Sequence, residues 1–120
     1  MLTCPYCRAE AIPKPLPGEL STAEAMELID GVASFGSPGP ILVIAGGDPL
    51  TRGDLWDLIS YASERGIRVS LTPSVTPLLN DTAIRKISEH GVSAVSISID
   101  SPYPEVHDSI RGFSLEGQPI

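Results

Sequence analysis

Two cysteines near the start of the chain, in the sequence Cys4-Pro5-Tyr6-Cys7, are spaced for chemistry at sulfur. Thiols two residues apart can ligate an iron–sulfur cluster, contribute half of a zinc site or form a redox-active dithiol. A redox dithiol would need a strand before the motif and a helix beginning at it, and the prolines from Pro13 onward oppose a long helix. A zinc site would need further ligands, and His90 and His107 lie far away on other elements. Part of an iron–sulfur site and a pair of unligated thiols both remain open on this evidence.

A glycine-rich turn, Gly46-Gly47-Asp48-Pro49, follows the continuous apolar run of residues 41–45. Such a run, bounded by turns, is typical of a parallel strand that is buried on both faces. Glycines allow backbone groups to approach a ligand closely, and we expect a positive φ at Gly47. Asp48 could then pair with an ammonium group of the ligand. The alternative is that the turn simply leads into the next helix, with Asp48 as its N-cap.

The rest of the chain alternates between helix and strand signals. Ser21 and Glu24 form a capping box before apolar residues at helical spacing, and Gly66 and Gly91 are suited to end helices. The expected elements are a helix over 22–34, a strand over 41–45, a helix from 54, a strand over 67–72, a helix from 80 or 81, and a strand over 94–99. This order predicts an α/β fold of three parallel strands joined by right-handed crossover helices.

We expect the chain to form one domain with three regions. Residues 1–20 hold the cysteines and a proline-rich connector, residues 21–112 hold the helix–strand repeats, and residues 113–120 form an irregular tail. A three-stranded parallel sheet has two unpaired edges, whereas parallel α/β folds normally have more strands, often eight around a barrel. We therefore expect the chain to be a segment of a larger protein.

Ligands of parallel α/β folds bind outside the carboxyl ends of the strands. Here those ends carry the sequences Gly-Gly-Asp-Pro, Thr-Pro-Ser-Val-Thr and Ser-Ile-Asp-Ser, each of them rich in small, polar or turn-forming residues. Because the strands are parallel, Asp48 and Asp100 should lie at the same end of the sheet. Thr72 and Ser74 are further candidate lining residues.

The remaining side chains are expected to have structural roles. Trp56 should pack against its neighbours, His90 should be a capping or surface residue, and His107 should lie in a short turn after the last strand. A solvated acidic face should comprise Glu19, Glu24, Glu27 and Asp30. The candidate core residues are Leu28, Ile29, Ile41, Val43, Ile44, Leu55, Ile59, Val69, Leu71, Ile84, Ile87, Val95, Ile97 and Ile99.

Composition limits the class of protein. The 120 residues carry a net charge of −7 and have a pI near 4.6, which argues against nucleic-acid binding through phosphate contacts. No apolar run approaches the ~20 residues of a membrane span, and no signal-peptide pattern precedes Cys4. Two closely spaced cysteines make a poor disulfide framework, so we expect a cytoplasmic protein whose thiols serve redox or metal chemistry.

Taken together, these residues resemble the radical S-adenosylmethionine (radical SAM) enzymes. That family has a C-x-x-x-C-x-x-C loop after its first barrel strand and a Gly-Gly-Glu-Pro-like motif after the second. Residues 1–7 match the last two cysteines of the loop, and residues 46–49 match the second motif with aspartate in place of glutamate. The resemblance covers residues 1–112. The segments that look like the branch with haem-modifying and peptide-modifying enzymes are Cys7–Ala11, Leu71–Leu79, Ser98–Asp100, His107-Asp108 and Arg111-Gly112.

The resemblance implies a fold, two cofactors and a set of roles. The fold is part of a partial (β/α)6 TIM-like barrel, and the cofactors are a [4Fe-4S] cluster and S-adenosylmethionine. An external electron donor would allow the cluster to cleave S-adenosylmethionine to a 5′-deoxyadenosyl radical, which abstracts hydrogen from a small-molecule or peptide substrate. The implied cluster ligands are Cys4 and Cys7, the implied contacts of the methionine ammonium are Gly46, Gly47 and Asp48, and the implied neighbours of adenine and ribose are Tyr6, Ser98 and Asp100.

Two departures from the family pattern bear on activity. The first cysteine of the loop would fall immediately before Met1, and the later barrel strands are missing from the sequence. We therefore expect the chain to be part of a radical SAM enzyme and to be inactive in isolation. The alternative function is a non-catalytic α/β module that binds a small molecule or a partner through its exposed sheet edges.

Overall fold

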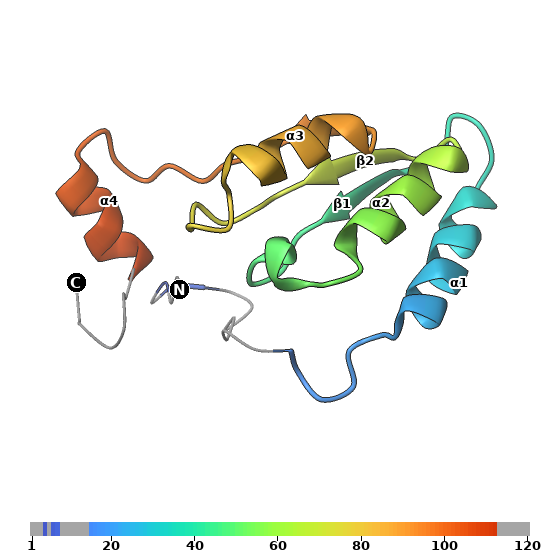
Figure 1. Cartoon of the computed structure of the whole chain (residues 1–120), viewed down its shortest axis with the longest axis horizontal. Helices are drawn as coiled ribbons and strands as arrows, with labels where there is room; N and C mark the ends of the chain where they lie inside the picture. Colours follow the sequence, from blue (N-terminus) through green and yellow to red (C-terminus); the bar gives the residue numbers. More distant parts are fainter. Residues whose placement is uncertain (1–3, 5, 8–14, 113–120) are drawn as a thin grey trace.

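The computed structural model describes residues 4, 6, 7 and 15–112, in which three strands alternate with helices (Figure 1). In chain order the elements are α1 (Thr22–Ala33), β1 (Ile41–Ile44), the 3₁₀ helix η1 (Pro49–Thr51), α2 (Leu55–Glu64), β2 (Arg68–Leu71), α3 (Asp81–Glu89), β3 (Val92–Val95) and α4 (Pro104–Arg111). The predicted α/β class is confirmed. The expected irregular tail, residues 113–120, and much of the expected connector lie outside the described residues.

The three strands form one sheet in the order of the chain. Both pairings are parallel: Leu42 lies beside Val69 and Ile44 beside Leu71, and β3 joins on the other side of β2 with a shift in register after Val69. Parallel pairing brings the carboxyl ends of all three strands to one end of the sheet. The turn after β1 and the segment after β3 therefore leave the sheet at the same end, as predicted.

Local sequence signals set the helix ends. Ser21 and Glu24 form the predicted capping box: Ser21 Oγ accepts from the Glu24 amide (3.3 Å), and the Glu24 carboxylate accepts from the Ser21 amide (2.8 Å). Asn80 caps α3 by accepting from the Ala83 amide (3.0 Å). Gly66, with a φ of +74°, follows α2 and permits the left-handed turn into β2.

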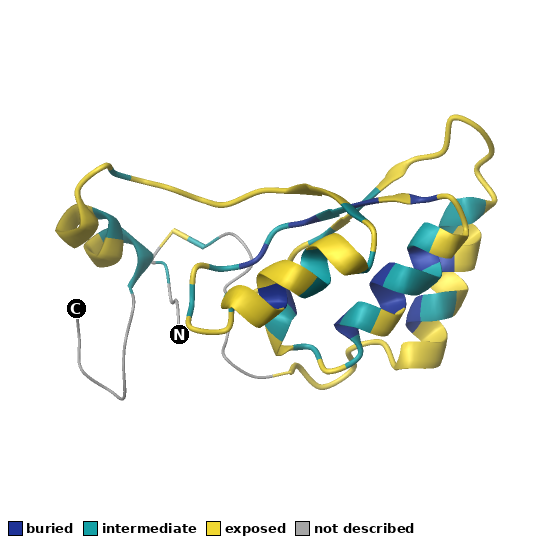
Figure 2. Cartoon of the chain, turned by 45° about the horizontal axis from the view of Figure 1, so that its top comes forward, coloured by how far each residue is buried: buried dark blue, intermediate teal, exposed yellow. Residues whose placement is uncertain are grey.

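The core lies between one face of the sheet and the helices α1 and α2, as Figure 2 shows by the dark buried positions. Ile29, Leu55, Ile59, Val69 and Leu71 are buried as predicted, and Ile44 and Ile87 pack against them while partly buried. The buried residues that the prediction missed are Ala25, Pro49, Leu58, Ala62, Ile67, Pro73 and Ala83.

The prediction that β1 is buried on both faces is wrong. Leu42 and Ile44 face the helices, whereas Ile41 and Val43 alternate to the opposite face and are 51% and 59% exposed. No described helix covers that second face, because α1, α2 and α3 all lie on the same side of the sheet (Figure 2). A continuous apolar run therefore has one solvated face here.

Five other candidate core residues are also exposed. Leu28 of α1 lines an open cavity beside β1, and Ile84 of α3 lies next to Ala83, which takes the inward position. The remaining three, which lie at or beyond the end of β3 where no described helix covers them, are Val95, Ile97 and Ile99.

The segment after β3 differs from the prediction in two ways. The strand ends at Val95 rather than 99, and the chain beyond it contains a further helix, α4, which the sequence analysis missed. His107 therefore lies within a helix and not in a short turn. Pro104 at the first position starts α4, and Gly112, with a φ of +61°, ends it.

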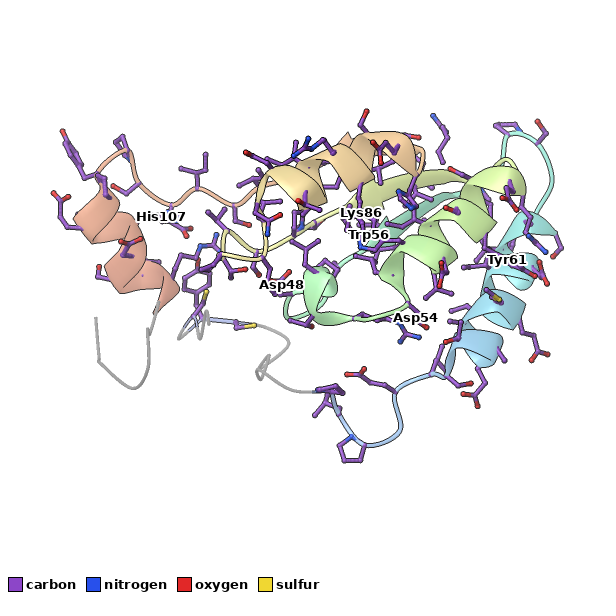
Figure 3. All side chains as sticks on the ribbon, viewed as in Figure 1. Asp48, Asp54, Trp56, Tyr61, Lys86 and His107 are labelled. Atoms are coloured by element: carbon purple, nitrogen blue, oxygen red, sulfur yellow. The ribbon has the colours of Figure 1, made fainter. Side chains whose placement is uncertain are left out.

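Of three residues assigned structural or surface roles, two are placed as expected and one differs. Trp56 of α2 lies beneath α3, with the Lys86 ammonium 5.5 Å from its ring centroid and the His90 ring 5.4 Å away (Figure 3). His90 is the C-cap of α3, as expected. Asp30, in contrast, is not simply solvated, because it pairs with Arg65 and accepts a hydrogen bond from the Tyr61 hydroxyl (3.0 Å).

In the part of the chain that the structure describes, no helix is long and apolar enough to span a membrane.

Candidate functional site

The glycine turn after β1 leads directly into a short helix. Gly46 has a φ of +137°, a conformation that favours glycine, and a Cβ added there would meet no heavy atom within 4 Å. The positive φ expected at Gly47 thus belongs to Gly46. Asp48 is extended and caps η1: its Oδ1 accepts from the Leu50 amide (3.1 Å), and its carbonyl accepts from the Thr51 amide (3.1 Å). The capping alternative is correct for η1, whereas α2 begins separately after Asp54.

The segment after β2 is tied to this turn. The Ser74 hydroxyl donates to the Gly47 carbonyl (2.8 Å), and the Thr76 hydroxyl donates to Asp48 Oδ2 (3.0 Å). A longer contact of 3.5 Å runs from the Ser74 amide to Asp48 Oδ1. Ser74 was predicted to line the site, and Thr76, which was not singled out, lies beside it. Two predicted strand ends are thereby brought together.

The cysteine loop meets the chain that follows β3. The Tyr6 hydroxyl donates to Asp100 Oδ2 (2.9 Å), and the same carboxylate forms an ion pair with Arg111 at the end of α4. The Cys4 thiol donates to the Arg111 carbonyl (3.3 Å), and the Arg111 guanidinium lies 5.9 Å from the Tyr6 ring centroid. Three predicted site residues, Cys4, Tyr6 and Asp100, are therefore neighbours.

The electrostatics of this group follow from its contacts. Desolvation, followed by the hydrogen bond to the Asp100 carboxylate, raises the pKa of Tyr6, so its hydroxyl stays protonated and donates. Partial burial opposes the charge on Arg111, but the bond to Asp100 prevails and raises the pKa of the guanidinium. His107 adds a further tie, since its Nδ1 accepts from the Asp100 amide (3.2 Å). Ser98, two residues earlier, is exposed.

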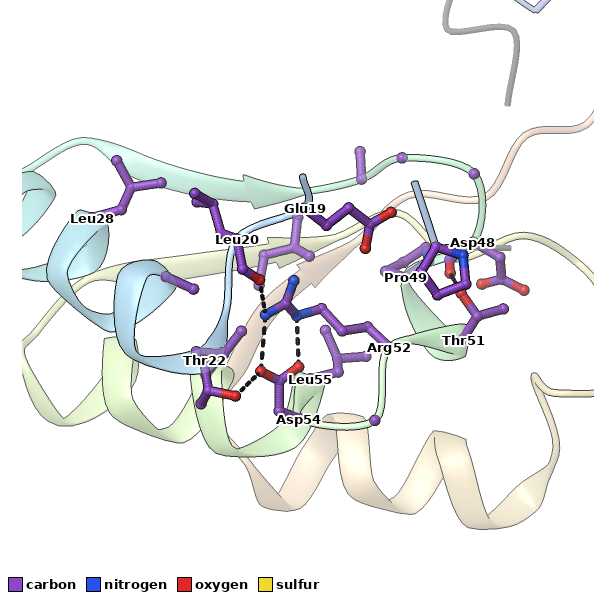
Figure 4. A pocket seen from close by; sticks show the side chains of 18 of the residues that line it. Glu19, Leu20, Thr22, Leu28, Asp48, Pro49, Thr51, Arg52, Asp54 and Leu55 are labelled. Atoms are coloured by element: carbon purple, nitrogen blue, oxygen red, sulfur yellow. Dashed lines mark hydrogen bonds and ion pairs between the residues drawn. The ribbon is translucent and has the colours of Figure 1, made fainter. Parts of the chain in front are cut away.

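A cavity of about 690 Å³ also borders the glycine turn and lies between α1 and β1 (Figure 4). Arg52 spans one wall: it forms an ion pair with Asp54 (2.6 Å) and donates to the Leu20 carbonyl (3.0 Å). The Thr22 hydroxyl also donates to Asp54 (2.6 Å). This clamp joins the start of α1 to the start of α2. Sequence reasoning missed it because Leu20 and Thr22 are 32 residues from their partners and the set belongs to no motif.

The described residues supply some of the ligands that a metal cluster needs, and they also offer a place for the polar end of an amino acid. No disulfide joins Cys4 and Cys7, and both are half-buried, so the described residues supply two thiols. They contain no group of three histidine, cysteine or acidic side chains that could hold a metal ion. The turn offers open space at Gly46 and, two residues on, the Asp48 carboxylate, an acceptor of the kind that pairs with the ammonium of an amino acid.

Comparison with known proteins identifies the family. Residues 1–117 match the model of the radical SAM superfamily. Over 111 residues, 92% of this chain, it is 49% identical to an AdoMet-dependent heme synthase of Oleidesulfovibrio alaskensis, of which it covers 28%. It is similarly 41% identical to an AdoMet-dependent heme synthase of Methanosarcina barkeri, covering 31%, and 32% identical to a mycofactocin maturase of Mycobacterium tuberculosis, covering 27%. The chain thus spans less than a third of these relatives, and it belongs to the radical SAM superfamily, whose cofactors are a [4Fe-4S] cluster and S-adenosylmethionine.

Proposed function

We propose that this chain forms the part of a radical SAM enzyme that binds S-adenosylmethionine beside the cluster. Gly46, Gly47 and Asp48 bind the methionine ammonium, and Cys4 and Cys7 supply two cluster thiolates. Tyr6, Ser98 and Asp100 lie along the adenosine part of the same ligand. When bound, the reduced cluster supplies the electron that cleaves S-adenosylmethionine to a 5′-deoxyadenosyl radical.

One observation carries the proposal: two groups far apart in sequence lie at the same end of a parallel sheet. The glycine turn follows β1, and the cysteine loop is tied through Tyr6 and Cys4 to residues that follow β3. This end of a parallel sheet is where α/β proteins bind ligands. The arrangement suits a ligand that reaches from thiolate-bound iron to a carboxylate.

The chain's own residues supply positioning and charge. The Asp48 carboxylate and the Gly47 carbonyl present oxygen acceptors to an ammonium group, and Gly46 leaves room for close approach. The Asp100 carboxylate is already engaged by Tyr6 and Arg111. Its role toward a ribose is therefore that of a positioned, partly neutralised acceptor and not of a free charge.

The relatives suggest the class of substrate. Those that are 49% and 41% identical are named AdoMet-dependent heme synthases, and the mycofactocin maturase is 32% identical. We propose a haem precursor as substrate, with an electron donor as partner, and a peptide as the competing class. In the intact protein, 5′-deoxyadenosine formation should rise with an iron tetrapyrrole and not with a peptide. A rise with the peptide alone would overturn the substrate assignment.

The binding role is tested by Asp48→Ala in the intact, cluster-loaded protein kept oxidised, with equilibrium dialysis of S-adenosylmethionine. Loss of a charge-assisted hydrogen bond should weaken affinity by about ten- to a hundredfold. Asp57→Ala, which removes an exposed carboxylate from the first turn of α2, is the matched control. Unchanged affinity in Asp48→Ala, together with a lowered melting temperature, would show that Asp48 only caps η1.

A further inference from the structure

Thr76 and Ser74 donate hydrogen bonds to the two acceptors of the glycine turn. Thr76 Oγ1 contacts Asp48 Oδ2 at 3.0 Å, and Ser74 Oγ contacts the Gly47 carbonyl at 2.8 Å. Both distances are within the ordinary range for hydroxyl donors. The two donors come from the segment after β2, about 27 residues from their acceptors, so neither contact follows from local chain geometry.

We propose that Thr76 and Ser74 are positioning residues that orient the Asp48 carboxylate and the Gly47 carbonyl toward the methionine ammonium. The inference rests on the proposed binding role of the turn and adds the device that fixes its geometry. Neither residue needs to touch the ligand. Each acts through the acceptor that it holds.

The donors around the Asp48 carboxylate leave one of its lone-pair positions open. A carboxylate has about four lone-pair positions, two on each oxygen. Among the described residues, the Leu50 amide and the more distant Ser74 amide approach Oδ1, and the Thr76 hydroxyl approaches Oδ2. Oδ2 therefore keeps one position for a further donor. Oδ1 is held mainly by the cap of η1, whereas the Thr76 hydroxyl is what holds Oδ2.

The aspartate at this position makes such support useful. Its side chain is one methylene shorter than the glutamate more common in this motif, so it has less reach toward a ligand. A short side chain held on both oxygens is pre-organised, and less ordering is needed when the ligand binds. Ser74 does the same for the backbone, because its bond to the Gly47 carbonyl fixes the peptide plane that precedes Asp48.

The test measures S-adenosylmethionine affinity in the intact, cluster-loaded protein kept oxidised, by equilibrium dialysis. Thr76→Val keeps the shape of the side chain and removes its donor, and should weaken affinity about five- to tenfold. Thr76→Ser retains the hydroxyl and should restore affinity to within about twofold. Ser74→Ala is a second, independent variant expected to weaken affinity. Thr82→Val, on the exposed surface of α3, is the control.

A double-mutant cycle separates positioning from mere stability. If Thr76 acts through Asp48, Thr76→Val should have little further effect on affinity in an Asp48→Ala background. Loss of melting temperature without loss of affinity in Thr76→Val and Ser74→Ala would overturn the inference. If Asp48→Ala weakens binding and neither hydroxyl variant does, the inference alone fails. If Asp48→Ala leaves binding unchanged, the proposed role of the turn fails first.

Discussion

The Tyr6 hydroxyl and Asp100 Oδ2 are 2.9 Å apart although 94 positions separate them in the sequence. The Asp100 carboxylate also pairs with Arg111, whose backbone carbonyl accepts from the Cys4 thiol. Two contacts thus hold the cysteine loop beside the end of α4: one reaches Arg111 through Asp100, and the other ends directly on the Arg111 carbonyl. A helix that the sequence analysis missed is what places the loop at the carboxyl ends of the strands.

We predict that Asp100→Ala releases the cysteine loop. It removes the acceptor of Tyr6 and the partner of Arg111 together, so the Cys4 thiol should become more accessible to solvent. In a Cys7→Ser background, the rate of Cys4 alkylation should rise by roughly a factor of five, as expected for loss of local hydrogen bonds. Mass spectrometry over a time course gives this rate.

Two further variants decide the cause of the change in alkylation rate. Asp108→Ala removes an exposed carboxylate from α4 that makes neither contact, and should leave the rate unchanged. Arg111→Gln should raise the rate as well if loop opening is the cause. A lower rate in Arg111→Gln would mean that the guanidinium charge, and not the hydrogen bonds that hold the loop, controls the reactivity of the Cys4 thiol.

Within the described residues, the sequence predicted the three strands, three of the four α-helices and the parallel order, because these elements depend on local capping and apolar periodicity. Asn80, Gly66 and the Ser21–Glu24 box mark helix ends by local geometry. Periodicity says less about what covers each face. Ile41 and Val43 belong to an apolar run typical of a strand buried on both faces. They are nevertheless exposed, because no described helix covers their face of the sheet.

The site was predicted as a set of strand ends and not as a set of contacts. Asp48, Ser74 and Asp100 were singled out because small and polar residues follow strands. Thiol spacing singled out Cys4, and the family resemblance added Tyr6. Thr76 stayed unassigned, although it lies in the same sequence as Ser74. Its partner is on another strand end, and pairing of that kind depends on the tertiary path of each loop.

The clamp of Arg52 and Asp54 gives a pH-dependent prediction. The hydrogen bond from Arg52, opposed by desolvation, lowers the pKa of Asp54 below its usual value. A depressed pKa contributes stability above about pH 4, where the unfolded carboxylate is also ionised, and loses it as pH falls toward the folded value. Asp54→Asn should therefore be less stable than wild type at pH 7 by about 1 kcal/mol, with the gap closing below pH ~4.

Urea unfolding between pH 3 and 7 measures this difference. Glu64→Gln, at the exposed end of the same helix, is the control and should parallel wild type throughout. Arg52→Ala should lower stability at pH 7 to a similar extent, and adding Asp54→Asn to it should cost little more. A gap between wild type and Asp54→Asn that persists unchanged at pH 3 would rule out the ion pair as its source.

Gly46 is the position in the turn where a side chain should do the most harm. Its φ of +137° is unfavourable for any other residue, yet an added Cβ would touch nothing within 4 Å. Gly46→Ala should therefore lose about 1–2 kcal/mol of unfolding free energy through backbone strain alone, without an internal clash. If the open space is where S-adenosylmethionine lies, the methyl group should also reduce affinity beyond what the loss of stability explains.

Gly53→Ala is the control, because Gly53 has similar free space and no positive φ. It should change stability by less than about 0.5 kcal/mol and leave affinity intact. Calorimetry and equilibrium dialysis on the same two variants separate strain from steric exclusion. Equal, small effects in both variants would mean that the turn neither stores strain nor faces the ligand.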